Sequence, residues 1–303
     1  MKPLFQGVCT ALVTPFRLDF VHLEVYDQLL DRQLRAGVTA LVVCGTTGES
    51  ATMTDTERLD LIGHTVDYVR GRCKVIAGTG SNATTHAITL SKEAEKLGAD
   101  GLLLVSPYYN KATEAGLIAH YTAIGDQVHL PCIVYNVPSR TGVNIPVSVY
   151  QALSHHPNFC GVKEASGDIV KIARIRQACG PEFSVWSGND DQVVPVMALG
   201  GHGIISVVSN LYPETMVRLA ALCMAGRYRE AANLQAALMP AIDALFCEVN
   251  PIQAALRLSG LDVGHCRLPL TDPTPEHLEL LKQMVGATVR TEPQENHTDP
   301  GTP

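Results

Sequence analysis

Short apolar runs recur along the chain, and each leads into a polar, glycine-bearing loop and then into a segment with helical apolar spacing. Parallel strands that are covered on both faces read as nearly continuous apolar runs, whereas amphipathic helices show a 3.6-residue period. Eight runs are predicted strands, at residues 8–13, 40–44, 75–77, 101–105, 132–135, 160–163, 183–186 and 203–208. Their alternation with helices over residues 1–210 predicts an α/β protein of the (β/α)8 TIM-barrel type rather than an open doubly wound sheet.

Local signals at the predicted helix ends agree with this reading. The helical spacing of residues 24–36 is closed by Gly37, and Thr54 with Glu57 forms a capping-box pattern at the start of the next helix. Gly37, Gly98 and Gly200 each stand between a helix and an apolar strand, where a left-handed helix cap is expected.

The strand–helix alternation stops after residue 210. Residues 213–226, 228–247 and 251–258 read as consecutive helices, so residues 211–290 are predicted to form a C-terminal helical layer. Residues 291–303 are polar and contain proline, and they are predicted to be a disordered tail.

Composition narrows the possible partners. The 23 Lys and Arg residues against 30 Asp and Glu residues give a net charge of −7, and no basic cluster occurs, so neither nucleic acid nor an anionic membrane is an expected partner. No signal peptide or membrane-spanning run is evident, which predicts a soluble, cytoplasmic protein with a small-molecule ligand. The nine cysteines include no CxxC pair and are interpreted as reduced packing residues, and the adjacent His155 and His156 as surface residues rather than metal ligands.

The first candidate for chemistry is Lys163, which interrupts an otherwise apolar strand in Gly161-Val162-Lys163-Glu164. Such a lysine either reaches solvent at the strand end or lies desolvated in a pocket, and both alternatives are open on this stretch alone. An amine held out of water favours its neutral, nucleophilic form.

Other unusual residues follow strands at the same predicted end of the barrel, where (β/α)8 enzymes carry their active sites. Tyr135 could exchange protons with a neighbouring amine, the Gly45–Gly48 loop could bind a carboxylate through backbone N–H groups and hydroxyls, and Arg140 suits a second carboxylate. Each feature alone has another reading: Tyr135 as a core residue, the Gly45–Gly48 loop as a phosphate nest without the lysine of a P-loop, Tyr108 and Tyr109 as interface packing, and Arg140 as a solvated loop residue. Their convergence on one rim favours a site, formed by Thr46, Thr47, Tyr108, Tyr109, Tyr135, Arg140, Lys163 and the 187–191 loop.

Five motifs closely resemble the 4-hydroxy-tetrahydrodipicolinate (dihydrodipicolinate) synthase family. They are GTTGES at 45–50, SPYYNK at 106–111, YNVPSRTG at 135–142, GVKEASGD at 161–168 and GGHGIISV at 200–207. The resemblance covers nearly the whole chain before the tail. It places the chain among the pyruvate-using Schiff-base barrels related to N-acetylneuraminate lyase, and YNVPSRTG favours the synthase branch.

The resemblance implies a role for each matching residue. Lys163 would form an imine with pyruvate, Tyr135 would transfer protons, and Thr46 and Tyr109 would complete a proton relay, with Tyr109 reaching a neighbouring subunit's site. Thr47 and Ile205 would hold pyruvate, and Arg140 would bind the carboxylate of L-aspartate 4-semialdehyde. The resemblance implies neither a metal nor an organic cofactor, and it implies a homotetramer built as a dimer of dimers.

Three departures from the family pattern stand out. Residues 112–116 read ATEAG, and Gln253 stands where proline is usual; neither is expected to touch the chemistry. In the family's lysine feedback site, His86 replaces a glutamate, so inhibition by L-lysine is predicted to be weak or absent. Four residues of that site are matched: Ser50, Ala51, Asn82 and Tyr108.

Two other functions remain open. Another pyruvate-dependent Schiff-base aldolase, acting on a sugar acid or a different 2-oxo acid, would keep Lys163 and Tyr135 but need not keep Arg140. A catalytically silent, ligand-binding barrel would be expected to have lost the lysine or the tyrosine, and both are present.

Overall fold

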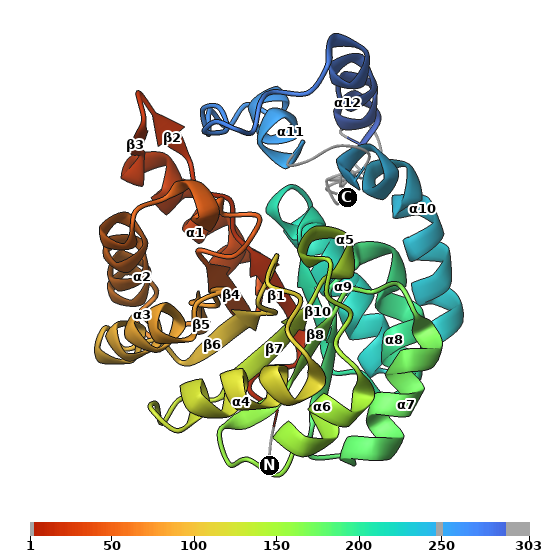
Figure 1. Ribbon diagram of the computed structural model, residues 1–303. Helices are drawn as coiled ribbons and strands as arrows, with labels where there is room; N and C mark the ends of the chain where they lie inside the picture. Colours follow the sequence, from red (N-terminus) through yellow and green to blue (C-terminus); the bar gives the residue numbers. More distant parts are fainter. Residues whose placement is uncertain (1–2, 247–250, 289–303) are drawn as a thin grey trace, which may run out of the picture.

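The computed structural model of the protein describes residues 3–246 and 251–288, and eight parallel strands in this part form a closed barrel (Figure 1). β1 pairs with both β4 and β10, which closes the ring. The predicted (β/α)8 architecture is therefore confirmed. The strands are β1 (Gly7–Ala11), β4 (Ala40–Val43), β5 (Lys74–Gly78), β6 (Gly101–Val105), β7 (Cys132–Asn136), β8 (Phe159–Glu164), β9 (Ser184–Ser187) and β10 (Gly203–Ser206).

Helices between and after the strands cover the outside of the barrel. The predicted capping box is present at α2: the Thr54 hydroxyl accepts from the Glu57 N–H at 3.2 Å, and the Glu57 carboxylate accepts from the Thr54 N–H at 2.9 Å. Gly37, Gly98 and Gly200 have φ of +79°, +87° and +85°, the left-handed conformation that glycine adopts without strain. The helices are α1 (Leu23–Ala36), α2 (Asp55–Val69), α3 (Thr84–Lys96), α4 (Glu114–Gly125), α6 (Val147–Leu153), α7 (Ile169–Cys179), α8 (Val193–Ala198) and α9 (Pro213–Met224).

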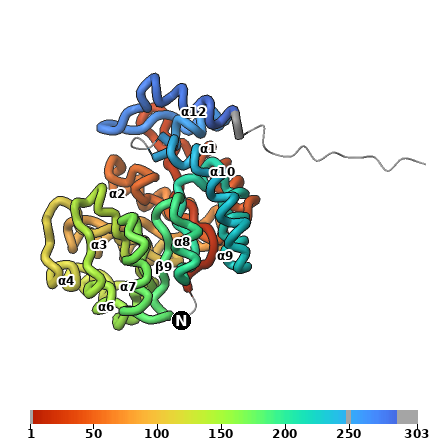
Figure 2. Tube along the Cα trace, turned by 90° about the vertical axis from the view of Figure 1, so that its right-hand side faces the viewer, coloured from red at the N-terminus to blue at the C-terminus, as the bar shows by residue number. Residues whose placement is uncertain are grey.

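The C-terminal layer contains α10 (Tyr228–Phe246), α11 (Ile252–Leu258) and α12 (Pro275–Thr288). α10 and α11 both pack against α12, and Figures 1 and 2 show this layer on the side of the barrel away from the N-terminus. The predicted domain boundary at residue 210 stays a prediction. α9, which follows that boundary and falls within the predicted layer of residues 211–290, packs against β1 and α8. The predicted tail at 291–303 lies outside the described residues, as do Cys247 and Asn250.

Several short elements were not foreseen. They are the hairpin of β2 (Phe16–Arg17) and β3 (Phe20–Val21), the single-turn helix α5 (Pro138–Thr141), and three 3₁₀ turns, η1 (Ser50–Thr52), η2 (Asp190–Gln192) and η3 (Val208–Asn210). Each is too short for a hydrophobic period to develop.

The strands separate two apolar cores because successive side chains point to opposite faces. The inner core fills the barrel, and its residues come from alternate strand positions; the outer core lies between strands and helices and includes Val134, Val162 and Val185. In the described part of the chain, no helix is long and apolar enough to cross a membrane. The inner core is Phe5, Cys9, Ala11, Ala40, Val42, Ile76, Leu103, Ile133, Tyr135, Val137, Trp186 and Ile205.

Candidate active site

Lys163 lies in β8 with its side chain inside the barrel. Its neighbour Val162 belongs to the outer core, so strand alternation turns Lys163 inward. The residue is only 4% exposed, and its Nζ is 4.2 Å from the ring centroid of Tyr135, the residue paired with it across β7. Of the two alternatives that the sequence left open, the structure therefore has the buried one.

The side chain of Lys163 passes close to Gly188, where there is no room for a side chain. A Cβ at that position would lie 3.2 Å from both Cγ and Cε of Lys163 and 2.6 Å from the Cβ of Ala165. Any larger residue after β9 would have to displace the lysine stem or the backbone that carries Ala165.

Behind this pair, the next residue of each strand points the other way into a buried polar network. The Glu164 carboxylate accepts from Asn136 Nδ2 at 2.8 Å and from the Tyr150 hydroxyl at 3.1 Å, and Lys171 Nζ lies 3.4 Å from it. All four side chains are buried. Because Asn136 and Glu164 are fixed, the preceding residues that carry Tyr135 and Lys163 are fixed as well.

A buried carboxylate, Asp190, lies close enough to Lys163 for their charges to interact. It accepts from the Ser206 hydroxyl and from the N–H groups of Val207 at 3.0 Å and Val208 at 3.3 Å. Complete burial raises the pKa of Asp190 to about 6, although these hydrogen bonds and the Lys163 charge favour its ionised form. The sequence placed residues 187–191 on the rim but gave no sign of which aspartate would be buried.

The loop from β4 to α2 carries Thr46, half-buried, and Thr47, which is 7% exposed. The Glu49 N–H donates to Thr46 O at 3.1 Å and closes a four-residue turn around Thr47 and Gly48. Cys44 and Glu49, with φ of +56° and +54°, are left-handed non-glycine residues at the two ends of this loop. Such a conformation costs about 1–3 kcal/mol and persists only where the surroundings enforce it.

Two of the remaining predicted residues lie at the surface. Tyr109, after β6, is 88% exposed with φ of +72°, so it is not packed into the site of its own chain. Arg140 is exposed on α5, directly after β7. Ile205, in contrast, is fully buried in β10 and belongs to the same inner core as Tyr135.

The residues of the predicted lysine site lie in the three consecutive segments that follow β4, β5 and β6, with His86 in the first turn of α3, and hydrogen bonds join these segments. His86 Nε2 is 2.9 Å from the Asp55 carboxylate, and its Nδ1 is 3.0 Å from the Ser81 hydroxyl. Asn110 Nδ2 donates to Asn82 O at 2.7 Å, and the Asn110 N–H donates to Tyr108 O. Ser50 and Ala51 form the start of η1, just before Asp55. Asp55 is a residue that the sequence did not single out.

A cavity of about 260 Å³ opens at the opposite end of the barrel, next to residues that precede β1 and β10. It is therefore remote from the strand ends that carry Lys163. Within residues 3–246 and 251–288, no group of three or more His, Cys, Asp or Glu side chains could hold a metal ion.

The fold and site together define a class: a (β/α)8 barrel with a buried amine beside a phenol at the carboxyl ends of its strands. The chain matches the dihydrodipicolinate synthetase family over residues 4–288, and it belongs to that family. The 4-hydroxy-tetrahydrodipicolinate synthase of Caldicellulosiruptor saccharolyticus is 49% identical over 284 residues, which cover 93% of this chain and 96% of that protein.

Two solved structures share the fold over nearly their whole length. A dihydrodipicolinate synthase described as a monomeric variant is 43% identical with a TM-score of 0.92, covering 94% of this chain and 97% of that one. The synthase of Cyanidioschyzon merolae, solved with lysine bound, is 41% identical with a TM-score of 0.92, covering 95% of this chain and 99% of that one.

Proposed function

We propose that this protein condenses pyruvate with L-aspartate 4-semialdehyde to give 4-hydroxy-tetrahydrodipicolinate, the lyase reaction that leads to diaminopimelate and lysine. The observation that carries the proposal is the buried Lys163 amine 4.2 Å from the Tyr135 ring at the strand ends. The membership in the dihydrodipicolinate synthetase family supports the choice of substrates.

The first half of the reaction takes place at Lys163. Its neutral amine adds to the keto carbon of pyruvate, and loss of water leaves an imine. Tyr135 gives and takes the protons of these steps, with Thr46 next in the relay. Thr47 and Ile205 hold the pyruvate. The cationic imine makes the pyruvate methyl group acidic, and loss of one methyl proton gives an enamine.

The second half joins the two substrates. The enamine carbon attacks the aldehyde carbon, and the new alkoxide takes a proton. The substrate's own amine then attacks the imine carbon, which closes the ring and releases Lys163. Arg140, exposed at the barrel mouth, binds the carboxylate of the aldehyde substrate through a charge-assisted pair.

Self-association completes the proposal. The 88% exposure and the left-handed backbone of Tyr109 fit a side chain that enters a partner's site, and a dimer of dimers is the assembly we propose. The relative described as a monomeric variant makes this a point for measurement. The cytoplasmic location expected from the sequence stays a prediction.

Reductive trapping tests the chemistry. Borohydride added with pyruvate should fix a three-carbon adduct on Lys163, located by peptide fragmentation. Lys171 is a matched internal control because it too is a buried lysine, but it is engaged by Glu164 and Asn144. Lys163→Ala should abolish trapping, and an adduct on Lys171, or none at all, would rule out the proposed mechanism.

A substrate panel tests the second half. With pyruvate present, aspartate semialdehyde should be consumed far faster than sugar-derived aldehydes. A preference for the sugar-derived aldehydes would assign the chain to the alternative aldolase function instead.

A further inference from the structure

Glu49 is a buried carboxylate for which the reaction above has no use. It is 2% exposed, and Gln253, the Arg267 backbone and the Cys266 thiol, its hydrogen-bond donors, all come from the C-terminal layer, about 200 positions later in the chain. Gln253 Nε2 donates to one oxygen, and the Arg267 N–H donates to the other at 2.9 Å. A short sequence window cannot reveal such partners.

The main chain of Glu49 sets the shape of the threonine loop. Its N–H closes the turn on Thr46 O, and its φ of +54° is one that a non-glycine residue rarely adopts. Such a conformation persists when the surrounding contacts over-determine it. At the side chain of Glu49, these contacts are the hydrogen bonds that its carboxylate accepts from Gln253 and Arg267.

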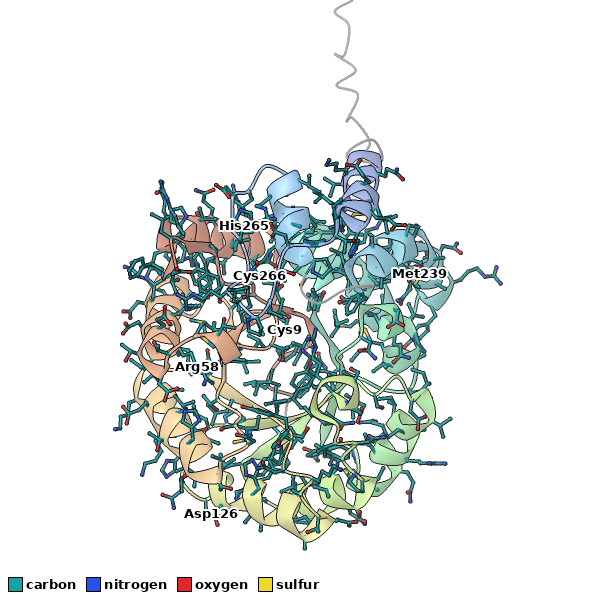
Figure 3. The ribbon with its side chains drawn as sticks, turned by 45° about the horizontal axis from the view of Figure 1, so that its top comes forward. Cys9, Arg58, Asp126, Met239, His265 and Cys266 are labelled. Carbon is teal, nitrogen blue, oxygen red and sulfur yellow. The ribbon has the colours of Figure 1, made fainter. Side chains whose placement is uncertain are left out.

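The donors are themselves held in place. Gln253, in α11, is 1% exposed, and its Oε1 accepts from the Cys266 thiol at 2.8 Å. The Arg267 guanidinium donates to the Glu57 carboxylate at 2.6 Å and to Thr52 O at 3.2 Å, so it contacts α2 and η1, which follow the threonine loop. Figure 3 labels Cys266 and its neighbour His265 on the segment that brings these groups to the barrel.

The carboxylate needs every one of these donors. Burial raises the pKa of Glu49, and the hydrogen bonds from the Arg267 backbone and from Gln253 act in the opposite direction. A buried acceptor that loses its donor keeps the full desolvation cost.

We propose that Glu49 and Gln253 are positioning residues, through which the C-terminal layer fixes Thr46 and Thr47 for pyruvate. This inference rests on the proposed function, because it takes the threonine loop to be the part of the site that meets pyruvate. The sequence predicted that Gln253 would not touch the chemistry. In the structure, two hydrogen bonds link it to Thr46: Gln253 donates to the Glu49 carboxylate, and the Glu49 N–H donates to Thr46 O.

Two matched substitutions of buried glutamines test the role. Gln253→Met removes the donor to Glu49, and Gln33→Met removes an equally buried amide that bonds Thr10 and Ser209 instead. A misplacement of about 1 Å can cost roughly a hundredfold in rate, so Gln253→Met should lower kcat/KM for pyruvate about ten- to a hundredfold. The kcat/KM for the aldehyde, which meets Arg140, should fall much less. Gln33→Met should lower the kcat/KM for pyruvate and the kcat/KM for the aldehyde by the same small factor. Its loss of thermal stability should be similar to that of Gln253→Met.

An exchange of the two groups provides the rescue. In Glu49→Gln alone, the new amide N–H₂ group would face another donor, either Gln253 Nε2 or the Arg267 N–H. Glu49→Gln combined with Gln253→Glu restores a donor and an acceptor between positions 49 and 253 and keeps acceptors for the Arg267 N–H and the Cys266 thiol, although Thr14 O loses its 3.4 Å bond from Gln253 Nε2. The double variant should recover most of the activity lost in Glu49→Gln. This double variant also decides the question if Gln253→Met does not fold.

The outcomes separate this inference from the proposed function. If the wild-type protein does not trap pyruvate on Lys163, the proposed function fails. If it does, but Gln253→Met matches Gln33→Met in both kcat/KM values, or the exchanged pair recovers no more activity than Glu49→Gln, the positioning role is overturned.

Discussion

At the scale of single residues, the site owes its properties to where two strands place neighbouring side chains. Tyr135 and Lys163 face each other inside the barrel, and one residue further on Asn136 and Glu164 bond to each other outside it. The same two strands thus carry a reactive pair on one face and its support on the other. A substitution in the outer pair should disturb the inner one.

Arg140 offers a test of substrate recognition. Loss of a charge-assisted pair costs about 1.5–3 kcal/mol, which is about ten- to over a hundredfold in affinity. Arg140→Ala should lower kcat/KM for aspartate semialdehyde by that factor while pyruvate trapping on Lys163 stays intact. Arg174→Ala is the control, because Arg174 is also an exposed arginine but lies on α7. Equal damage to both steps would refute the assignment of Arg140.

The buried Asp190 predicts a pH dependence of stability. Its pKa in the folded protein is about 6 against an ordinary 3.8, so between these values the folded state binds the proton more tightly than the unfolded chain. The contribution of Asp190 to the free energy of unfolding therefore falls as pH rises through this window, by on the order of 3 kcal/mol at most.

Asp190→Asn removes that contribution because the amide does not titrate. The stability of the variant relative to wild type, measured by denaturant titration from about pH 4 to about pH 7, should improve with rising pH. A difference that stays constant over this range would contradict the prediction.

At the scale of elements, the sequence predicted the barrel strands well because each is an apolar run that ends in glycine or polar residues. The run at 101–105 coincides with β6, and the other seven differ by a few residues at their ends. The two-residue strands β2 and β3 and the four-residue α5 were missed, since elements of that length carry no period.

The site could be predicted only in part, for a related reason. Lys163 stands out because a charge in an apolar strand is unusual. Glu49, Asp55 and Asp190 do not stand out, because what distinguishes them is a partner elsewhere in the chain: Gln253, His86 and Ser206. Nothing in the residues adjacent to them encodes those contacts.

The contact between α2 and α3 bears on feedback by L-lysine. His86 already pairs with Asp55, so the carboxylate nearest to it is engaged, and the loss of one charged bond to the ligand amounts to about 1.5–3 kcal/mol. Half-inhibition should lie above about a millimolar, which corresponds to roughly 4 kcal/mol of binding. Titration of L-lysine into an assay of the condensation of pyruvate with aspartate semialdehyde measures the half-inhibiting concentration, and D-lysine is the control. Half-inhibition below about a millimolar would disprove the prediction.

The Asp55 contact also shapes the variant that should gain inhibition. His86→Glu alone would set two carboxylates side by side, since His86 Nε2 is 2.9 Å from Asp55. Asp55→Asn combined with His86→Glu removes this repulsion and leaves the carboxylate at position 86 without an imidazole partner, so that it can accept from the ligand's ammonium group. The double variant should be inhibited more strongly by L-lysine than the wild-type protein or either single variant.

At the scale of the whole molecule, the exposed Tyr109 predicts that active sites are shared between subunits. Mixed oligomers of Tyr109→Phe and Lys163→Ala subunits should recover activity, because some pairings contain one intact site. Tyr135→Phe mixed with Lys163→Ala is the matched control: these two residues meet within one chain, so no pairing restores a site. Absence of recovery in the first mixture, with subunit exchange proven by mass, would indicate a self-contained site.

The pairing of β1 with β10 has a consequence for how the protein is made. Gly7 is opposite Gly203, so the ring closes only when the last strand has left the ribosome. At about 5–20 residues per second, the intervening 200 or so residues take roughly 10–40 s to synthesise. Throughout that interval the nascent chain presents β1 as an unpaired edge, open to aggregation. The step that completes the catalytic rim is also the one that ends this exposure.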